Sequence, residues 1–235
     1  MPIEREGGFL WTHDLGLTPS IGIESARLDE CVTEAHARRA GGVFGHPSFG
    51  FAQEDLDFLA RMPWLVQVWF WDVSLRSIDG LYTLSGLRYF GVHPDRPPLD
   101  FSRFPALEHV VWIHEPRDRG LEAAASVRHV ALWHYKPRSK HFAALDLPPE
   151  LESLGINWAN PSTLAGIREL PRLRRLEIHR CRNLASLDEL PRIAPNLEEL
   201  VITTSGRLSD YAALAALPHL RFARYDGRDL IAGAV

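Results

Sequence analysis

The stretch LRRLEIHRCRNLASL, residues 173–187, places leucine or isoleucine at its first, fourth and sixth positions, with charged residues between them. Alternation of apolar and polar side chains is typical of a β-strand that buries one face. Apolar residues then return about every third position in NLASLDELPRIAPNL, residues 183–197, which favours a short helical turn. The stretch therefore predicts a strand followed by a tight helical return.

The same pattern recurs along most of the chain. Its starts lie 22, 20, 20, 24, 22, 24 and 23 residues apart. Between copies, segments such as STLAGIRELPRL, residues 162–173, repeat the second apolar pattern, and prolines such as Pro171 and Pro218 end the turn before the next strand. Near-constant spacing predicts a repeat architecture. The copies begin at Leu65, Leu87, Leu107, Val127, Leu151, Leu173, Leu197 and Leu220.

These copies resemble leucine-rich repeats, whose unit of about 20 to 29 residues carries the pattern L-x-x-L-x-L. The resemblance covers roughly residues 56–226. It implies an α/β solenoid, a leucine-rich-repeat arc with a parallel β-sheet on the concave face and short helices or 3-10 turns on the convex face. The family pattern also has Asn or Cys at the ninth position, where the side chain bonds backbone groups. Because only Cys181 matches, we expect irregular convex turns, particularly at residues 116–126 and 134–150.

The first 55 residues lack clean copies of the repeat. Good helix formers followed by glycine predict a helix at about residues 24–40, and GVFG at residues 42–45 is interpreted as a strand of a degenerate first repeat. Terminal repeats must cover an otherwise open core. We therefore expect an N-terminal cap at residues 1–55 and about eight repeats, forming one continuous domain, at residues 56–235.

The composition of the chain indicates which kinds of partner and which cellular location to expect. The 235 residues carry a formal net charge of −4, so neither a nucleic acid nor an anionic membrane is expected as a partner. No apolar run approaches the roughly 20 residues of a membrane helix, and the first residues do not form a secretory signal. The two cysteines, Cys31 and Cys181, suit reduced, buried thiols. A cytoplasmic protein is predicted.

The repeat register predicts which side chains project from the concave face. Positions three, five and seven of each copy should point outward. Aromatic residues around small ones in the N-terminal half resemble a protein-binding hot spot, and charged residues in the C-terminal half resemble a polar rim. The predicted partner-binding residues are Gln67, Trp69, Trp71, Tyr89, His93, His109, His129, Trp133, Asn157, Arg175, Glu177 and His179.

Two interpretations of the aromatic residues stay open. Either they contact a partner directly, or they are structural, packed in the core or beneath a cover. Residues 1–23, which include FLWTH at residues 9–13, are the candidate for such a cover.

Histidines offer the main candidate chemistry. His109 and His129 share position three, and His114 and His134 share position eight, so each pair could approach within metal-ligand reach. No carboxylate or third histidine accompanies either pair at a spacing that completes a tetrahedral site. The sequence also lacks G-x-S-x-G, H-E-x-x-H, C-x-x-C and a glycine-rich phosphate loop. We therefore expect no enzyme, no cofactor and no metal, and a metal-dependent enzyme is the least favoured hypothesis.

The favoured hypothesis is a non-catalytic scaffold that binds a protein of unknown identity through its concave face. An alternative follows from the family resemblance. Small bacterial leucine-rich-repeat proteins without signal peptides can act as immunity proteins that neutralise a cognate toxin.

Overall fold

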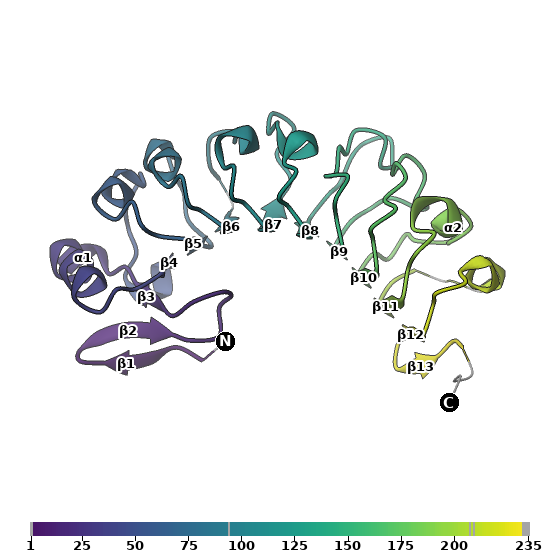
Figure 1. Ribbon diagram of the computed structural model, residues 1–235, viewed down its shortest axis with the longest axis horizontal. Helices are drawn as coiled ribbons and strands as arrows, with labels where there is room; N and C mark the ends of the chain where they lie inside the picture. The colour runs from purple at the N-terminus through teal and green to yellow at the C-terminus, as the bar shows by residue number, and fades with distance from the viewer. Residues whose placement is uncertain (1, 94, 207, 209, 232–235) are drawn as a thin grey trace. The chain divides into compact units, whose positions relative to one another are not determined.

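The computed structural model describes residues 2–93, 95–206, 208 and 210–231. It forms two compact units, which we call unit 1 (Met1–Val111 and Arg117–Arg119) and unit 2 (Trp112–Pro116 and Gly120–Val235). In each unit the strands line one side and short helical turns the other, and strand order follows chain order (Figure 1). No helix among the described residues is long and apolar enough to cross a membrane.

Unit 1 begins with an antiparallel part. β1 (Glu4–Glu6) pairs with β2 (Phe9–Thr12), which pairs with β3 (Ser20–Gly22). A 3-10 turn, η1 (Ser25–Arg27), then leads into α1 (Leu28–Ala37), which lies within the predicted helical range. The helix buries Cys31, Val32 and Ala35 on one face, and acidic residues in its first turn complement the helix dipole.

The repeats of unit 1 form a parallel ladder in the predicted register. Gln67 lies opposite Tyr89, and Tyr89 opposite His109, so position three of one copy pairs with position three of the next. The chain returns between strands through 3-10 turns. The strands are β4 (Gly42–Gly45), β5 (Gln67–Phe70), β6 (Tyr89–Val92) and the first residues of β7 (His109–Ile113); the turns are η2 (Pro47–Phe49), η3 (Asp57–Arg61), η4 (Asp79–Thr83) and η5 (Phe101–Arg103).

Unit 2 continues the same pattern. Ser153 lies opposite His129 and Arg175, and Glu199 lies opposite Arg175 and Phe222. Its last two strands pair antiparallel. The strands are β8 (His129–Trp133), β9 (Ser153–Asn157), β10 (Arg175–His179), β11 (Glu199–Thr203), β12 (Phe222–Tyr225) and β13 (Arg228–Asp229); the returns contain η6 (Leu121–Ala123), α2 (Leu190–Ile193) and η7 (Ala212–Ala216).

Two returns of unit 2 are irregular. Residues 134–150 form turns without a helix, as expected. Residues 162–173 also form only turns, although their apolar spacing predicted a helix. Gly166 explains the difference, because its φ of +91° is left-handed and a Cβ there would lie 2.3 Å from the backbone nitrogen of Ala143. Close contact with the neighbouring return replaces the helix.

Positions one, four and six of the repeats form the core. In the copy that opened the analysis, Leu173, Leu176 and Ile178 are buried. Position nine of this copy is also buried, and Cys181 Sγ donates to the carbonyl of Ile156 across 3.6 Å, as the family pattern implies. Ser205 fills the same role in the next copy, since its Oγ accepts the amide of Cys181 at 3.0 Å. Serine can therefore replace the asparagine or cysteine of the pattern.

Candidate functional site

The predicted binding residues lie on the strand face, which we define as the sheet surface formed by positions three, five and seven of the repeats. They divide into two groups of equal size. Unit 1 contains Gln67, Trp69, Trp71, Tyr89, His93 and His109, and unit 2 contains His129, Trp133, Asn157, Arg175, Glu177 and His179.

The strand face of unit 1 carries a continuous row of aromatic rings. The ring centroids of Trp71 and Trp69 lie 6.3 Å apart, those of Trp69 and Tyr89 5.7 Å, and those of Tyr89 and His109 5.7 Å. His93 adds an edge contact to Trp69 at 6.1 Å. These are ordinary distances for stacked and edge-on aromatic pairs. The row is therefore packed within itself.

Part of the first 23 residues covers part of this row, and Trp69, Trp71 and Tyr89 remain half-buried. Leu10 and Leu15 form a buried cluster with Phe44, and Trp69 and Trp71 pack against it. The chain then passes directly over β5 and β6. A Cβ placed on Gly16 would lie 2.5 Å from Gln67 Oε1 and 3.0 Å from the ring of Tyr89. For unit 1, the structure therefore supports the interpretation in which residues 1–23 cover aromatic residues of the strand face.

Gln67 is the clearest correction. The prediction that it is open to a partner is wrong, because its side chain is completely buried. Its Oε1 accepts the amide of Leu17 at 2.6 Å, and its Nε2 donates to Ser20 Oγ at 2.8 Å. Both ends of the amide are therefore used to hold the covering segment on β5.

The pKa of Tyr89 reflects the same burial. Desolvation raises the pKa of its hydroxyl to about 12. Burial has this effect because it disfavours the charged phenolate. The hydroxyl of Tyr89 is therefore protonated at neutral pH, and the ring acts as an apolar surface beneath the cover.

Unit 2 presents a different aromatic group on its strand face. Trp133 at the end of β8 and Trp158 directly after β9 have ring centroids 5.0 Å apart. His134 stacks on Trp158 at 5.5 Å, and the guanidinium of Arg180 lies 4.9 Å from the centre of the same ring. Trp133 and Trp158 are half-buried, whereas Arg180 is exposed. We call these four residues the tryptophan patch.

The predicted set omitted Trp158 and Arg180. Both occupy position eight of their repeats, immediately after a strand, and both have left-handed backbones, with φ of 51° and 55°. Asp72, His134 and Thr204 occupy the same position with the same backbone. The recurrence of position eight was present in the sequence, but its left-handed geometry was not. That geometry returns the position-eight side chain to the edge of the strand face.

A network of charged side chains lies beside the tryptophan patch on β10 and β11. Arg175 bonds Glu177 on its own strand and donates to Glu199 Oε2 at 2.6 Å. His179 lies 3.2 Å from Glu177 Oε2 and 2.5 Å from Thr203 Oγ1. Burial alone would raise the pKa of Glu177, but the bonds from Arg175 and His179 outweigh it and lower the pKa.

Two other predicted residues of unit 2 differ in exposure. Asn157 is buried, and its Nδ2 donates to the carbonyl of Leu132 at 3.4 Å, so the prediction that it is open to a partner is wrong. Because the Asn157 amide is buried and bonded to the neighbouring strand, it is not available to contact a partner. His129 is half-buried and faces Ser153 across the ladder.

Three of the histidines considered for metal binding, His109, His114 and His134, pack against aromatic rings. Within unit 2, His114 lies edge-on to Tyr135 at 4.9 Å, while His134 stacks on Trp158. Burial, with a smaller contribution from Lys136, lowers the pKa of His134. Across the described part of the chain, no three histidine, cysteine or acidic side chains are grouped to hold a metal ion.

Comparisons with known proteins bear on the fold. No family model and no curated protein matches the sequence. Among solved structures, the chain is similar to an internalin (inlF) from Listeria monocytogenes str. 4b F2365, with a TM-score of 0.53 and 17% identity over 76% of this chain and 52% of that one. It is similar to internalin C2 (inlC2) of the same strain, with a TM-score of 0.52 and 17% identity over 74% of this chain and 76% of that one.

These matches confirm the predicted fold class. The chain spans about half the length of the first internalin. What the chain shares with both internalins is the leucine-rich-repeat architecture, in which short parallel strands alternate with 3-10 turns. At 17% identity the likeness concerns the fold alone.

Proposed function

We propose that this leucine-rich-repeat protein is a non-catalytic module that binds a protein partner through the strand face of unit 2. The tryptophan patch carries the proposal. Tryptophan and arginine are enriched at the centres of protein interfaces, where a few side chains supply most of the binding energy. Here Trp133, Trp158 and Arg180 lie together at neighbouring strand ends.

The charged network gives this surface the composition of an interface. An apolar aromatic centre with polar residues around it is typical of protein-binding sites. Arg175, Glu177 and His179 are already bonded to one another or to β11. Side chains that are held in place lose less conformational entropy when a partner docks. The surface is therefore suited to binding without rearrangement.

The aromatic row of unit 1 does not support the same role. Gln67 is bonded to the covering segment, and Trp69 and Trp71 pack against Leu10 and Leu15. A partner would first have to displace the chain's own residues. We therefore assign the partner-binding role to unit 2 and a packing role to the aromatic row of unit 1.

An affinity capture from native lysate tests the proposal. Val201 on the strand face, replaced by a photo-crosslinking amino acid, should crosslink the captured protein. Changing Trp133→Ala together with Trp158→Ala should weaken its binding about 30-fold, which corresponds to ~2 kcal/mol. Loss of capture by a variant whose circular dichroism matches wild type would assign the site to the patch.

Trp64→Ala is the matched control. Trp64 is an exposed tryptophan of unit 1, 36% accessible, that directly precedes the first repeat position of its copy. Its Nε1 donates to the carbonyl of Ala40, and its ring contacts that of His36. This variant should retain full binding. Equal capture by the double variant and wild type, or no crosslinked protein from the Val201 crosslinking variant, would contradict the proposal.

A further inference from the structure

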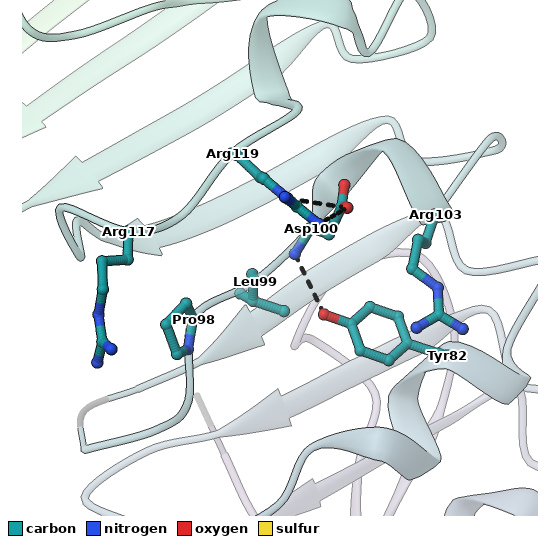
Figure 2. Close-up of a pocket in the computed structure, with 7 residues that line it drawn as sticks. All are labelled: Tyr82, Pro98, Leu99, Asp100, Arg103, Arg117 and Arg119. Atoms are coloured by element: carbon teal, nitrogen blue, oxygen red, sulfur yellow. Dashed lines mark hydrogen bonds and ion pairs between the residues drawn. The ribbon is translucent and has the colours of Figure 1, made fainter.

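Unit 1 contains a polar cavity of about 350 Å³ among its turns, away from the strand face. Tyr82 of η4 and Arg103 of η5 line it together with Asp100, Arg117 and Arg119 (Figure 2). Three of the lining side chains are arginines and one is an aspartate, so the lining carries a net charge of +2 (three positive, one negative). This excess is local, because the whole chain carries a net charge of −4.

A buried ion pair holds the walls of this cavity in place. Asp118, between the two lining arginines, accepts two bonds from Arg96 at 2.8 and 2.7 Å and a third from the amide of Leu99 at 2.7 Å. The side chains of Arg96 and Asp118 are only 1% and 0% exposed. Backbone bonds join the same segments, since Arg119 donates to Leu99 at 2.9 Å. The arginines therefore project from a rigid support.

The three lining arginines differ in the partners that their guanidinium groups contact. Arg119 is paired with Asp100 at 2.9 Å. Arg103 lies 3.7 Å above the ring of Tyr82, a cation–π contact that leaves its N–H donors available. Arg117 makes no ion pair with any residue that the structure describes. Figure 2 shows Arg103 and Arg117 at opposite sides of the cavity, with Asp100 and Arg119 between them.

Tyr82 supplies a further donor. Its hydroxyl oxygen accepts the amide of Asp100 at 3.1 Å, as Figure 2 shows. A phenol can accept and donate at the same time, so its hydrogen remains available for a second partner. The cavity thus combines unused guanidinium donors with one neutral hydroxyl donor.

We propose that this arginine pocket binds the phosphate group of a phosphate monoester. A monoester carries about two negative charges at neutral pH, which matches the net charge of the lining, whereas a carboxylate carries one. The planar guanidinium fork fits two phosphate oxygens at once. The ester could belong to a small molecule or to a phosphorylated side chain of a protein. The site is independent of the tryptophan patch and goes beyond the proposed function.

Calorimetric titration with phenyl phosphate at about pH 7.5 tests the pocket, with benzoate as the singly charged comparison. We expect a Kd below about 1 mM for phenyl phosphate and binding about tenfold weaker for benzoate. Affinity should fall as the pH drops through about 6, where the monoester loses its second charge. Equal affinities for the two probes, or no binding of phenyl phosphate, would overturn the proposal.

Variants locate the binding site. Arg103→Gln and Arg117→Gln should each weaken phenyl phosphate binding about tenfold, because each removes a charge-assisted donor. Arg76→Gln is the matched control, since Arg76 is an 82% exposed arginine of unit 1 that pairs with Glu54 outside the pocket. If Arg76→Gln weakens binding as much as the pocket variants do, the attraction is non-specific and the proposal fails.

A last comparison separates the two sources of the ester. A capped phosphoserine peptide and its unphosphorylated form are titrated beside phenyl phosphate. Tighter binding of the phosphopeptide would identify a phosphorylated protein as the source, and tighter binding of phenyl phosphate would identify a small ester. Binding of the unphosphorylated peptide as tightly as the phosphopeptide would contradict recognition of the phosphate.

Discussion

The strand faces of unit 1 and unit 2 carry aromatic residues at related repeat positions but use them differently. In unit 1, Trp69 and Tyr89 lie beneath the chain's own N-terminal segment. In unit 2, Trp133 and Trp158 pack against each other, with Arg180 above. The repeat register decides which way a side chain points. Whether that side chain meets the chain itself or a partner depends on residues outside the repeat.

The cover also shows how a repeat protein closes its own apolar surface. Large exposed aromatic patches promote association, so they are either binding sites or a liability. Residues 10–20 cover part of the strand face of unit 1. Leu15 contributes apolar packing, and the amide of Leu17 donates a hydrogen bond to Gln67. The comparison therefore predicts that unit 1 is sensitive to changes at the cover and that unit 2 tolerates equivalent changes.

The largest effect is expected for Leu15→Asp. This substitution should lower the free energy of unfolding by roughly 3 kcal/mol, because it removes buried apolar contacts and places a carboxylate in an apolar cluster. Urea denaturation followed by tryptophan fluorescence measures the change. Leu17→Asp, in the same segment but 38% exposed, should change the stability by less than about 0.5 kcal/mol. Equal losses in both variants would show that residues 10–20 are not docked.

Gln67→Ala should cost about 2 kcal/mol of unfolding free energy. It leaves the amide of Leu17 and the hydroxyl of Ser20 without their partner in a buried place. Ser153→Ala changes the same repeat position in unit 2 and should cost less than about 0.5 kcal/mol. Similar losses at the two positions would remove the distinction between the covered and the open face.

Alkaline titration of the tyrosines tests burial of the aromatic row directly. The pKa of Tyr89 is raised from 10.0 to about 12 by burial. Since the folded pKa lies above the unfolded one, the stabilisation is complete below about pH 10 and is lost as the pH rises through about 12. Burial also raises the pKa of Tyr135 and Tyr225, so the phenolate absorbance should show several late steps, of which Tyr89→Phe removes one. In Leu15→Asp that step should move toward pH 10, and an unchanged step would contradict the cover.

The smallest effect is expected for Glu177→Gln in unit 2. Its partner side chains are 49% and 29% exposed, so solvent screens the ion pairs and the loss at pH 7 should be below about 1 kcal/mol. The pKa of Glu177 is lowered in the folded protein, so its contribution is present above the ordinary glutamate pKa of 4.5 and is lost as the pH falls through the folded pKa. Denaturation at several pH values should show the two proteins converging in acid. A constant difference would exclude an ionic origin.

The sequence predicted which residues lie on the strand face, but not which of them are covered by other segments of the chain. The alternation in LRRLEI correctly assigned Leu176 and Ile178 to the core and Arg175 and Glu177 to the surface. It gave no sign that Gln67 would be buried, because the segment that buries it lies about 50 residues earlier in the chain. Trp158 was missed because a left-handed residue after a strand breaks the alternation.

By itself, the sequence determined the repeat, its register and the fold class, because these follow from apolar residues at fixed short spacings. Only the tertiary structure decided which aromatic residues are covered and that Arg103, Arg117 and Arg119 line one cavity. Those features come from contacts between segments far apart in the chain, whose pairing no local periodicity encodes. The local spacing of apolar residues therefore specifies which way a side chain points, and long-range packing specifies whether that side chain is accessible.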